Sequence, residues 1–209
     1  MARASPRSWV RPMRDAATIR LAVPSDAAEI HAIYTPVVRE TVISFEIDPP
    51  SEAEMAARIA RCAEEERPWL VLVRNDRIEG YAYATTHRSR AAYRWTVESS
   101  VFVAQGARGK GVGRALYRAL LALLDIQGYA TVLAGIALPN AASIALHESV
   151  GFRPAGVFAS VGHKLDEWRD VGWWSCTLGA AGRSPGPPLT LAEATATDAW
   201  RRALEDATG

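Results

Sequence analysis

Apolar residues recur along this chain in two different patterns, one typical of strands and one typical of helices. Together they predict a protein that contains both. Short apolar runs rich in branched or aromatic residues favour strands, whereas apolar residues three or four positions apart favour helices. The expected strands span residues 18–23, 68–74, 78–86, 95–104, 131–137, 152–161 and 168–178. A first helix is expected to begin near residue 25. Four more helices are expected over residues 51–66, 112–127, 141–150 and 190–206.

Residues with strong local preferences mark the ends of these elements. Ser25 or Asp26 can cap the first helix, and Pro36 is expected to break or kink it. The sequence Ser51-Glu-Ala-Glu54 is a capping box at the start of the second helix. Residues 162–167 are expected to form the loop that joins the last two strands.

The order of these elements is β-α-α-β-β-β-α-β-α-β-β, which indicates an α/β (α+β) domain built around one sheet. We expect a mixed central sheet of about six or seven strands, flanked by about four helices. Residues 18–179 are expected to form this domain, preceded by a flexible extension over residues 1–17. Residues 180–209 are expected to form a proline-rich linker and a C-terminal helix.

Composition narrows the class of protein. A chain of 209 residues with 49% apolar residues can form one domain with a full core. A net charge of +1 gives no reason to expect nucleic acid or a membrane as partner, and no apolar run could span a bilayer. The four histidines lack metal-ligand spacing, and the two cysteines form no C-x-x-C pair. We therefore expect a cytoplasmic protein with reduced thiols and no metal.

The most informative stretch is a strand, a glycine-rich loop and a long helix between residues 101 and 124. Gly109, Gly111 and Gly113 let backbone N–H groups approach an anion at the helix N-terminus. No Gly-Lys-Ser/Thr sequence closes a P-loop, and the mid-chain position suits a dinucleotide fingerprint poorly. The stretch predicts a pyrophosphate-binding loop, and the alternative is an ordinary glycine-rich turn. Three basic residues surround the same point: Arg108, Lys110 and Arg114.

Several motifs resemble those of one enzyme superfamily. The pattern Arg108-x-x-Gly111-x-Gly113 resembles the coenzyme A loop of the GNAT acetyltransferases. Further segments resemble the phosphinothricin and methionine sulfoximine N-acetyltransferases of that superfamily: Phe45, Pro68–Val71, Ala92–Ser99, Leu138–Asn140, Leu146–Glu148 and Trp168–Trp174. The resemblance covers about residues 18–178 and implies the GNAT fold, with acetyl-CoA as co-substrate. The residues expected to bind coenzyme A are Val101, Phe102, Val103, Arg108, Gly109, Lys110, Gly111, Val112, Gly113, Arg114 and Asn140.

Two residues are candidates for proton transfer. An amine must lose a proton before it attacks a thioester, and a carboxylate can take that proton directly or through a water. Glu98, on the strand before the glycine loop, is the candidate base, and the resemblance implies the same role; the alternative is a solvated strand residue. His147 is the candidate proton donor to the departing thiolate, and the alternative is a histidine that serves structure. The backbone N–H groups of Phe102 and Val103 are the expected oxyanion donors.

Recognition of a free amino acid requires a partner for its carboxylate, which an arginine fork provides. The resemblance makes the loop before Trp95 one wall of the substrate pocket, and Lys164 lies in a predicted turn that reaches the partner subunit's site in related enzymes. For each charged residue the alternative is a solvated surface group, and Asn140 is equally a candidate helix cap. The candidate substrate-binding residues are Phe45, Arg88, Arg90, Tyr93 and Lys164.

The motifs together indicate an N-acetyltransferase that modifies the α-amino group of a small amino acid or analogue by direct transfer. Phosphinothricin, methionine sulfoximine and methionine sulfone are the leading substrates that the resemblance implies. A homodimer is also implied, with Trp168, Trp173 and Trp174 near the interface or in ordinary core packing. Two alternatives stay open: a protein or polyamine acetyltransferase, and a non-catalytic module that binds acetyl-CoA.

Overall fold

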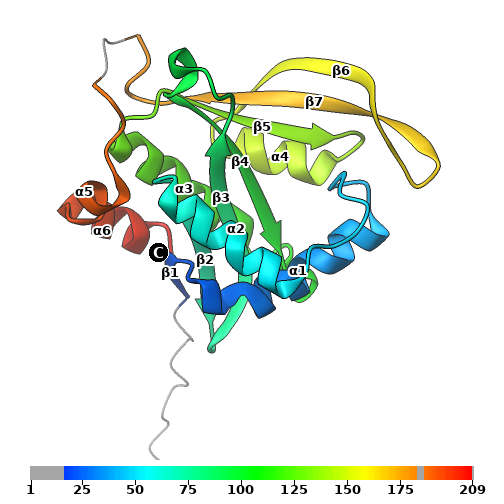
Figure 1. Ribbon diagram of the computed structural model, residues 1–209, viewed down its shortest axis with the longest axis horizontal. Helices are drawn as coiled ribbons and strands as arrows, with labels where there is room; N and C mark the ends of the chain where they lie inside the picture. The colour runs from blue at the N-terminus through cyan, green and yellow to red at the C-terminus, as the bar shows by residue number, and fades with distance from the viewer. Residues whose placement is uncertain (1–16, 183–185, 209) are drawn as a thin grey trace, which may run out of the picture.

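The computed structural model describes residues 17–182 and 186–208, and these form one seven-stranded sheet (Figure 1). The strand order is β1-β2-β3-β4-β5-β7-β6, and all neighbours are antiparallel except β4 and β5. The expected extension over residues 1–17 lies outside the described residues, apart from Ala17. The strands are β1 (Thr18–Leu21), β2 (Trp69–Arg74), β3 (Arg77–Thr86), β4 (Thr96–Val103), β5 (Thr131–Ala137), β6 (Arg153–Lys164) and β7 (Glu167–Thr177).

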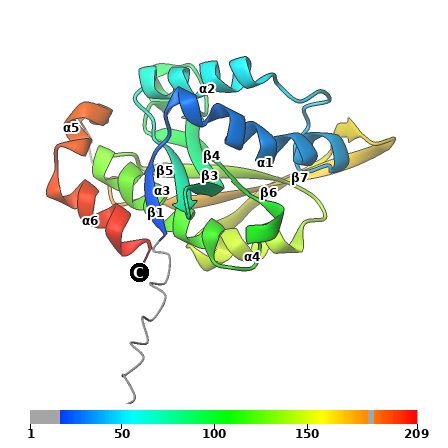
Figure 2. The same cartoon turned by 90° about the horizontal axis from the view of Figure 1, so that it is seen from below.

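Helices cover both faces of the sheet (Figure 2). The helices α1 (Ala27–Glu40) and α2 (Glu52–Glu64) lie on one face. The helices α3 (Val112–Gln127) and α4 (Ala141–Ser149) lie on the other, and the short helices α5 (Leu191–Thr195) and α6 (Asp198–Asp206) pack beside α3. The expected mixed central sheet of six or seven strands, flanked by helices, is confirmed.

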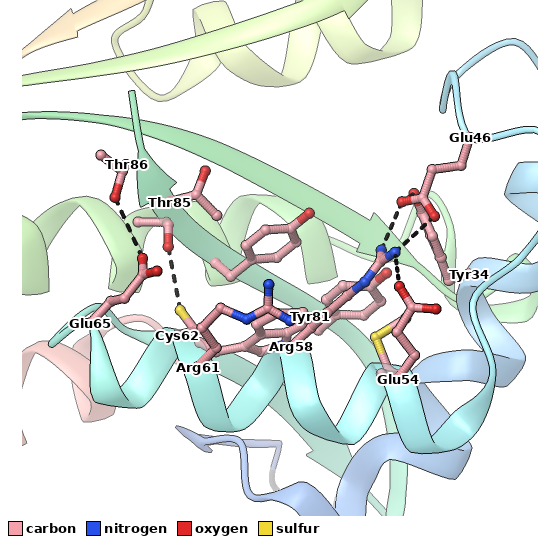
Figure 3. Close-up of a pocket in the computed structure, with 14 residues that line it drawn as sticks. Tyr34, Glu46, Glu54, Arg58, Arg61, Cys62, Glu65, Tyr81, Thr85 and Thr86 are labelled. Carbon is pink, nitrogen blue, oxygen red and sulfur yellow. Dashed lines mark hydrogen bonds and ion pairs between the residues drawn. The ribbon is translucent and has the colours of Figure 1, made fainter. Parts of the chain in front are cut away.

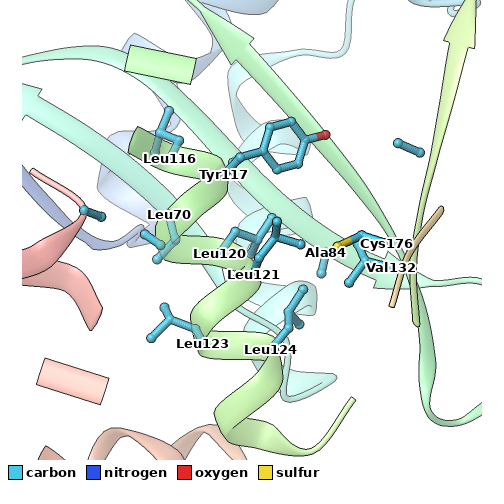
Figure 4. Close-up of a cluster of buried hydrophobic side chains, with 14 of the residues drawn as sticks. Leu70, Ala84, Leu116, Tyr117, Leu120, Leu121, Leu123, Leu124, Val132 and Cys176 are labelled. Atoms are coloured by element: carbon cyan, nitrogen blue, oxygen red, sulfur yellow. The ribbon is translucent and has the colours of Figure 1, made fainter. Parts of the chain in front are cut away.

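The long helix α3 anchors the core on its face of the sheet (Figure 4). Leu116, Leu120 and Leu124 recur at four-residue intervals, so they share one face, and all are fully buried. Gly128 ends the helix with a φ of 89°, a left-handed conformation that glycine adopts without steric cost. This packing fixes the start of α3, and therefore the glycine loop, against the end of β4.

The parallel strands β4 and β5 separate after only three paired residues each, which leaves an opening between them. The two strands pair only between Thr96–Glu98 and Thr131–Leu133, although both continue beyond these residues. Beyond Glu98, the edge of β4 that faces β5 has no strand partner among residues 17–182 and 186–208. Backbone N–H and C=O groups without a ladder partner are free to bond another extended chain.

The first helix is not broken at Pro36, which was expected to break or kink it. It does not end there but continues to Glu40. Buried residues lie on both sides of the proline, Tyr34 before it and Val37 after it. Packing of this apolar face against the sheet outweighs the loss of one helical hydrogen bond.

The hairpin of β6 and β7 is longer than predicted. The strands are joined by only Leu165 and Asp166, which have φ values of 53° and 59°, as a tight two-residue hairpin turn requires. The loop expected over residues 162–167 is therefore mostly strand, and Lys164 closes β6 instead of lying in the turn. The hairpin projects beyond the body of the domain (Figure 1).

The C-terminal segment forms two short helices instead of the single predicted one. It returns to the domain and packs on α3 and β1, where Trp200 is 4% exposed. The buried amide of Gln127 in α3 donates to the carbonyl of Leu189 at 3.0 Å and to that of Glu66 at 2.9 Å. The backbone N–H of Leu191 donates to the Glu66 carboxylate at 2.6 Å. These contacts join the segment to the same core that supports the glycine loop.

Candidate active site

The glycine loop presents an uncapped helix N-terminus. Gly109 and Gly111 have φ values of 72° and 83°, and no atom lies within 4 Å of a Cβ built on either. Gly111 is the N-cap of α3, and no side chain of the described part of the chain caps it. Gly113 serves packing, because a Cβ there would lie 3.0 Å from the Leu146 side chain of α4. The loop fits a pyrophosphate, since its N–H groups stay available and space is left in front of the backbone.

The three basic residues around this loop are exposed and lie on two sides of it. Arg108 lines a hollow shared with α1, whereas Lys110 and Arg114 line another beside β2 and the end of α6. No ion pair is formed by these three side chains within residues 17–182 and 186–208. They remain available to attract an anion to the loop.

A narrow cleft of about 80 Å³ lies where β4 and β5 separate. One wall is β4 from Ser99 to Phe102, and the opposite wall is β5 from Gly135 to Ala137. Asn140 lines the cleft and also caps α4, since its side chain accepts from the N–H of Ser143 at 3.1 Å. Three of the predicted coenzyme A residues therefore meet at one opening: Val101, Phe102 and Asn140.

His147 is buried in the wall of this cleft, and both of its ring nitrogens have partners. Nδ1 lies 2.7 Å from the carbonyl oxygen of Ser143, so it carries the proton and donates. Nε2 lies 2.7 Å from the hydroxyl of Tyr117, which therefore donates to it. Burial lowers the pKa of His147 below its ordinary value, which favours this neutral ring. Tyr117 is itself fully buried, and burial raises its pKa.

Glu98 pairs with a histidine on the opposite face of the sheet from α3. The Oε1 atom of Glu98 lies 2.7 Å from Nδ1 of His87, the first residue after β3. Glu98 alternates with the buried residues Val97 and Ser99 and so points to the α1–α2 face. Its cross-strand neighbour is Thr85.

A cavity of about 530 Å³ lies between α2 and the sheet on this face (Figure 3). Its floor includes Trp69 stacked on Tyr83, with ring centroids 4.2 Å apart. Arg58 on its rim is held by Glu46 and Glu54, each at 2.7 Å. Thr85 and Thr86 close the end of the cavity next to Glu98 and His87, and the remaining lining residues are Tyr34, Met55, Arg61, Cys62, Glu65, Tyr81 and Ala84.

The loop before β4 carries three predicted substrate residues, and contacts through His87 link two of them, Arg88 and Tyr93, to Glu98. The ring of Tyr93 packs edge-on against His87 at 5.6 Å, and the Arg88 guanidinium lies 6.0 Å from the Tyr93 centroid. Arg90 is exposed in the same loop. The structure therefore links Arg88, Tyr93, His87 and Glu98 in one chain of contacts.

The other two predicted substrate residues lie at the hairpin. Phe45 packs against Gly162 so closely that a Cβ there would lie 2.1 Å from its ring. Lys164 is 5% exposed, and its Nζ donates to the carbonyls of Val38 and Ser44, each at 2.6 Å. Lys164 thereby braces the loop that carries Phe45 within the same chain, and its role toward substrate stays a prediction.

Comparison with known proteins agrees with this geometry. Residues 19–173 match the model of the acetyltransferase (GNAT) domain. The chain belongs to the GNAT acetyltransferase family. It is an acetyl-CoA-dependent N-acetyltransferase.

Two relatives show the range of the similarity. A phosphinothricin N-acetyltransferase of Alcaligenes faecalis is 42% identical over 166 residues, which cover 79% of this chain and 84% of that protein. An L-methionine sulfoximine/L-methionine sulfone acetyltransferase of Pseudomonas aeruginosa is 34% identical over 172 residues, which cover 81% of this chain and 99% of that protein.

Solved structures extend the agreement to the fold of this acetyltransferase. A phosphinothricin acetyltransferase from Sinorhizobium meliloti in complex with acetyl-CoA aligns with a TM-score of 0.77 at 36% identity, covering 83% of this chain and 94% of that one. A putative acetyltransferase from Salmonella typhimurium with acetyl-CoA also aligns with a TM-score of 0.77. It is 32% identical, and the alignment covers 82% of this chain and 98% of that one.

Three polar residues of the site escaped the sequence analysis: His87, Tyr117 and Ser143. His87 lies in a basic loop with no motif of its own, and Tyr117 lies in a leucine-rich helix whose pattern gives it no chemical role. Alternation along β4 could have indicated Tyr117, since it places Ser99 on the face that α3 covers. Among the described residues, no three His, Cys, Asp or Glu side chains are grouped to hold a metal, and no helix is long and apolar enough to cross a membrane.

Proposed function

We propose that this acetyltransferase modifies the α-amino group of a small amino acid or analogue, such as phosphinothricin, methionine sulfoximine or methionine sulfone. The position of Glu98 carries the proposal. Its neighbour Thr85 lines the larger cavity, and its neighbour Ser99 lines the cleft between β4 and β5. A cavity of about 530 Å³ suits a small molecule with a polar end. An amine in the cavity would meet a thioester in the cleft at Glu98.

Acetyl-CoA would be held by the loop residues 108–114 and by the unpaired edge of β4 at residues 101–103. It supplies the thioester carbonyl, and the N–H groups of Phe102 and Val103 are the proposed donors to the oxyanion. Removal of the amine proton depends on Glu98. His147 holds the Tyr117 hydroxyl at the cleft, and the Tyr117 O–H would have to turn from Nε2 of His147 before it could donate to the departing sulfur.

Direct transfer without an acyl-enzyme is supported by the state of the two thiols. Burial raises the pKa of Cys62 to about 12 and also raises that of Cys176. The thiolate is the nucleophilic form of cysteine, so neither side chain is activated at neutral pH. The amine of the substrate is therefore the proposed nucleophile.

The carboxylate of the substrate is the proposed ligand of Arg88 and Arg90. Both arginines are exposed in the loop that also carries Tyr93. Phe45 and Tyr93 would form the apolar wall, and Lys164 would act by holding the Phe45 loop in place. An arginine fork binds a carboxylate through two parallel hydrogen bonds.

The test is thiol release from acetyl-CoA with a panel of amines. The panel contains phosphinothricin, methionine sulfoximine, methionine sulfone, common amino acids, a polyamine and a lysine peptide. We expect saturable release with the first three compounds and a higher KM after Arg90→Gln. Release only with the polyamine or the peptide would overturn the substrate class and keep the family. Coenzyme A binding without release from any amine would favour a binding module.

A homodimer formed through the β6–β7 hairpin is also proposed. Almost the whole of β6 is exposed, although its sequence includes Val157, Phe158 and Val161. Trp168 of β7 is 65% exposed. Contiguous exposed apolar side chains of this kind are typical of protein–protein interfaces.

A further inference from the structure

The pair formed by His87 and Glu98 has a defined proton arrangement. An ionised carboxylate only accepts hydrogen bonds, so the 2.7 Å contact requires the proton to be on Nδ1 of His87. Nε2 then carries the lone pair of the neutral ring. No hydrogen-bond partner of Nε2 occurs among the described residues. Glu98 thus leaves His87 with one free basic nitrogen.

The surroundings of His87 restrict the orientation of its ring. Tyr93 packs edge-on against it at 5.6 Å, and Trp173 of β7 packs edge-on at 6.4 Å. The His87 side chain is 16% exposed, compared with 35% for Glu98. The ring is therefore held between two aromatic side chains and is still reachable from outside.

Few charged groups face this ring. On its own loop, Arg88 lies over the ring of Tyr93, which in turn packs against His87. On β4 the charged neighbour is Glu98, whereas the residue of β7 that packs against the ring is the uncharged Trp173. Thr86, which precedes His87, is hydrogen-bonded to Glu65 of the α2 end at 3.4 Å. The carboxylate of Glu98 is the direct hydrogen-bond partner of the ring.

The pair lies next to residues that line the two spaces proposed for the reactants. His87 directly follows Thr85 and Thr86, which line the cavity on the α2 side. Glu98 directly precedes Ser99, where the cleft between β4 and β5 begins. A proton acceptor at this point is placed to take the proton of an amine that attacks a thioester in the cleft.

Matching of proton affinities favours the imidazole over the carboxylate. Free carboxyl groups titrate near pH 4 and α-amino groups near pH 8, whereas imidazoles titrate at about pH 6.5. An acceptor is most effective when its pKa is near the working pH. The imidazole is thus the better-matched acceptor for an ammonium proton at neutral pH.

We propose that Nε2 of His87 accepts the proton of the incoming ammonium group, and that Glu98 is a positioning residue that holds the ring and stabilises the imidazolium. The inference rests on the proposed function. The ammonium gives one proton to Nε2, and the free amine then forms a C–N bond to the thioester carbonyl carbon. Collapse of the intermediate breaks the C–S bond; the second nitrogen proton goes to the sulfur, and the imidazolium proton goes to solvent.

The test is the pH dependence of kcat/KM for the best amine of the panel, measured for His87→Gln, Glu98→Gln and the wild type. Gln at position 87 can still donate to Glu98 but cannot accept a proton. We expect His87→Gln to lower kcat/KM at pH 7 by about 100- to 10 000-fold. We also expect it to remove the decline in kcat/KM between pH 8 and 5, the range in which imidazoles become charged. His31→Gln in α1 is the matched control, expected to leave the profile unchanged.

A second measurement does not depend on turnover. Nitrogen-15 chemical shifts of the histidine rings should show His87 protonated at Nδ1 in the wild type and a mixture of tautomers in Glu98→Gln. If no amine is acetylated but this tautomer is found, the proposed function fails and the paired geometry stands. If His87→Gln retains the acidic decline, or if Nε2 carries the proton in the wild type, Glu98 is the acceptor and this proposal is wrong.

Discussion

Burial of one imidazole should make the stability of this acetyltransferase depend on pH. His147 is 4% exposed, and burial lowers its pKa below the ordinary 6.5. In the unfolded chain the same side chain takes up a proton as the pH falls below about 6.5. The unfolded state then binds more protons, so the free energy of unfolding decreases as the pH falls. We expect the melting temperature to decline between pH 7 and pH 5, measured by calorimetry.

The control for this prediction compares two histidine variants. His147→Gln removes the titrating group, so its melting temperature should fall less steeply with pH than that of the wild type. His163→Gln changes an exposed residue of the hairpin and should keep the wild-type slope. An identical slope in all three proteins would show that other groups control the acid response.

At the scale of elements, the C-terminal helices should stabilise the whole domain. Trp200 of α6 is buried in the same cluster as Leu116 and Leu120 of α3. We expect Trp200→Ala to lower the free energy of unfolding by about 3–5 kcal/mol, because it leaves a large cavity in this cluster. Urea unfolding followed by circular dichroism measures the change.

The neighbouring residue of α6 provides the matched control. The Arg201 side chain is 70% exposed and forms an i,i+3 pair with Asp198 at 2.8 Å. Such exposed pairs contribute little, so Arg201→Ala should cost less than about 1 kcal/mol. Equal stability of Trp200→Ala and the wild type would mean that the segment does not support the core.

The elements themselves were largely predictable, because their signals are local. The bounds of α3 and β5 match the expected residues 112–127 and 131–137, since an apolar pattern and a terminal glycine or proline define each of them. The helix start at Ser51 follows the same logic, as its side chain accepts from the N–H of Glu54 at 3.1 Å. Local preference failed at Pro36, where packing against the sheet decides the outcome.

Contacts between distant residues were not predictable. Lys164 looked like a turn residue, yet its ammonium binds the carbonyls of Val38 and Ser44, more than 100 positions earlier. Tyr117 and His147 meet across two helices and gave no signal of a pair. The partner of Glu98 is likewise set by the register of β3 and β4. The resemblance to a known family indicated the candidate residues, but the residues that they contact could be identified only from the fold.

For the whole molecule, the projecting hairpin carries the apolar surface that a second copy would cover. Four large apolar residues of the hairpin are more than half exposed on its strands: Val157, Phe158, Val161 and Trp168. A charge placed among them would have to be buried without a partner in the dimer. We expect the wild type to sediment as a dimer and the double variant Phe158→Asp, Val161→Asp to sediment as a monomer.

The same variant tests whether the dimer matters for catalysis. Phe158 packs against Trp173 at 6.4 Å, and Trp173 packs against His87 at the same centroid distance. Loss of the partner should therefore loosen the wall beside His87 and raise the KM for the amine, while coenzyme A affinity stays within about twofold because the glycine loop lies on α3. Val23→Asp, at an exposed apolar residue far along the chain from the hairpin, is the control and should remain dimeric. A wild type that sediments as a monomer at every concentration would exclude the hairpin interface. The exposed apolar residues of the hairpin would then need an explanation within a single chain.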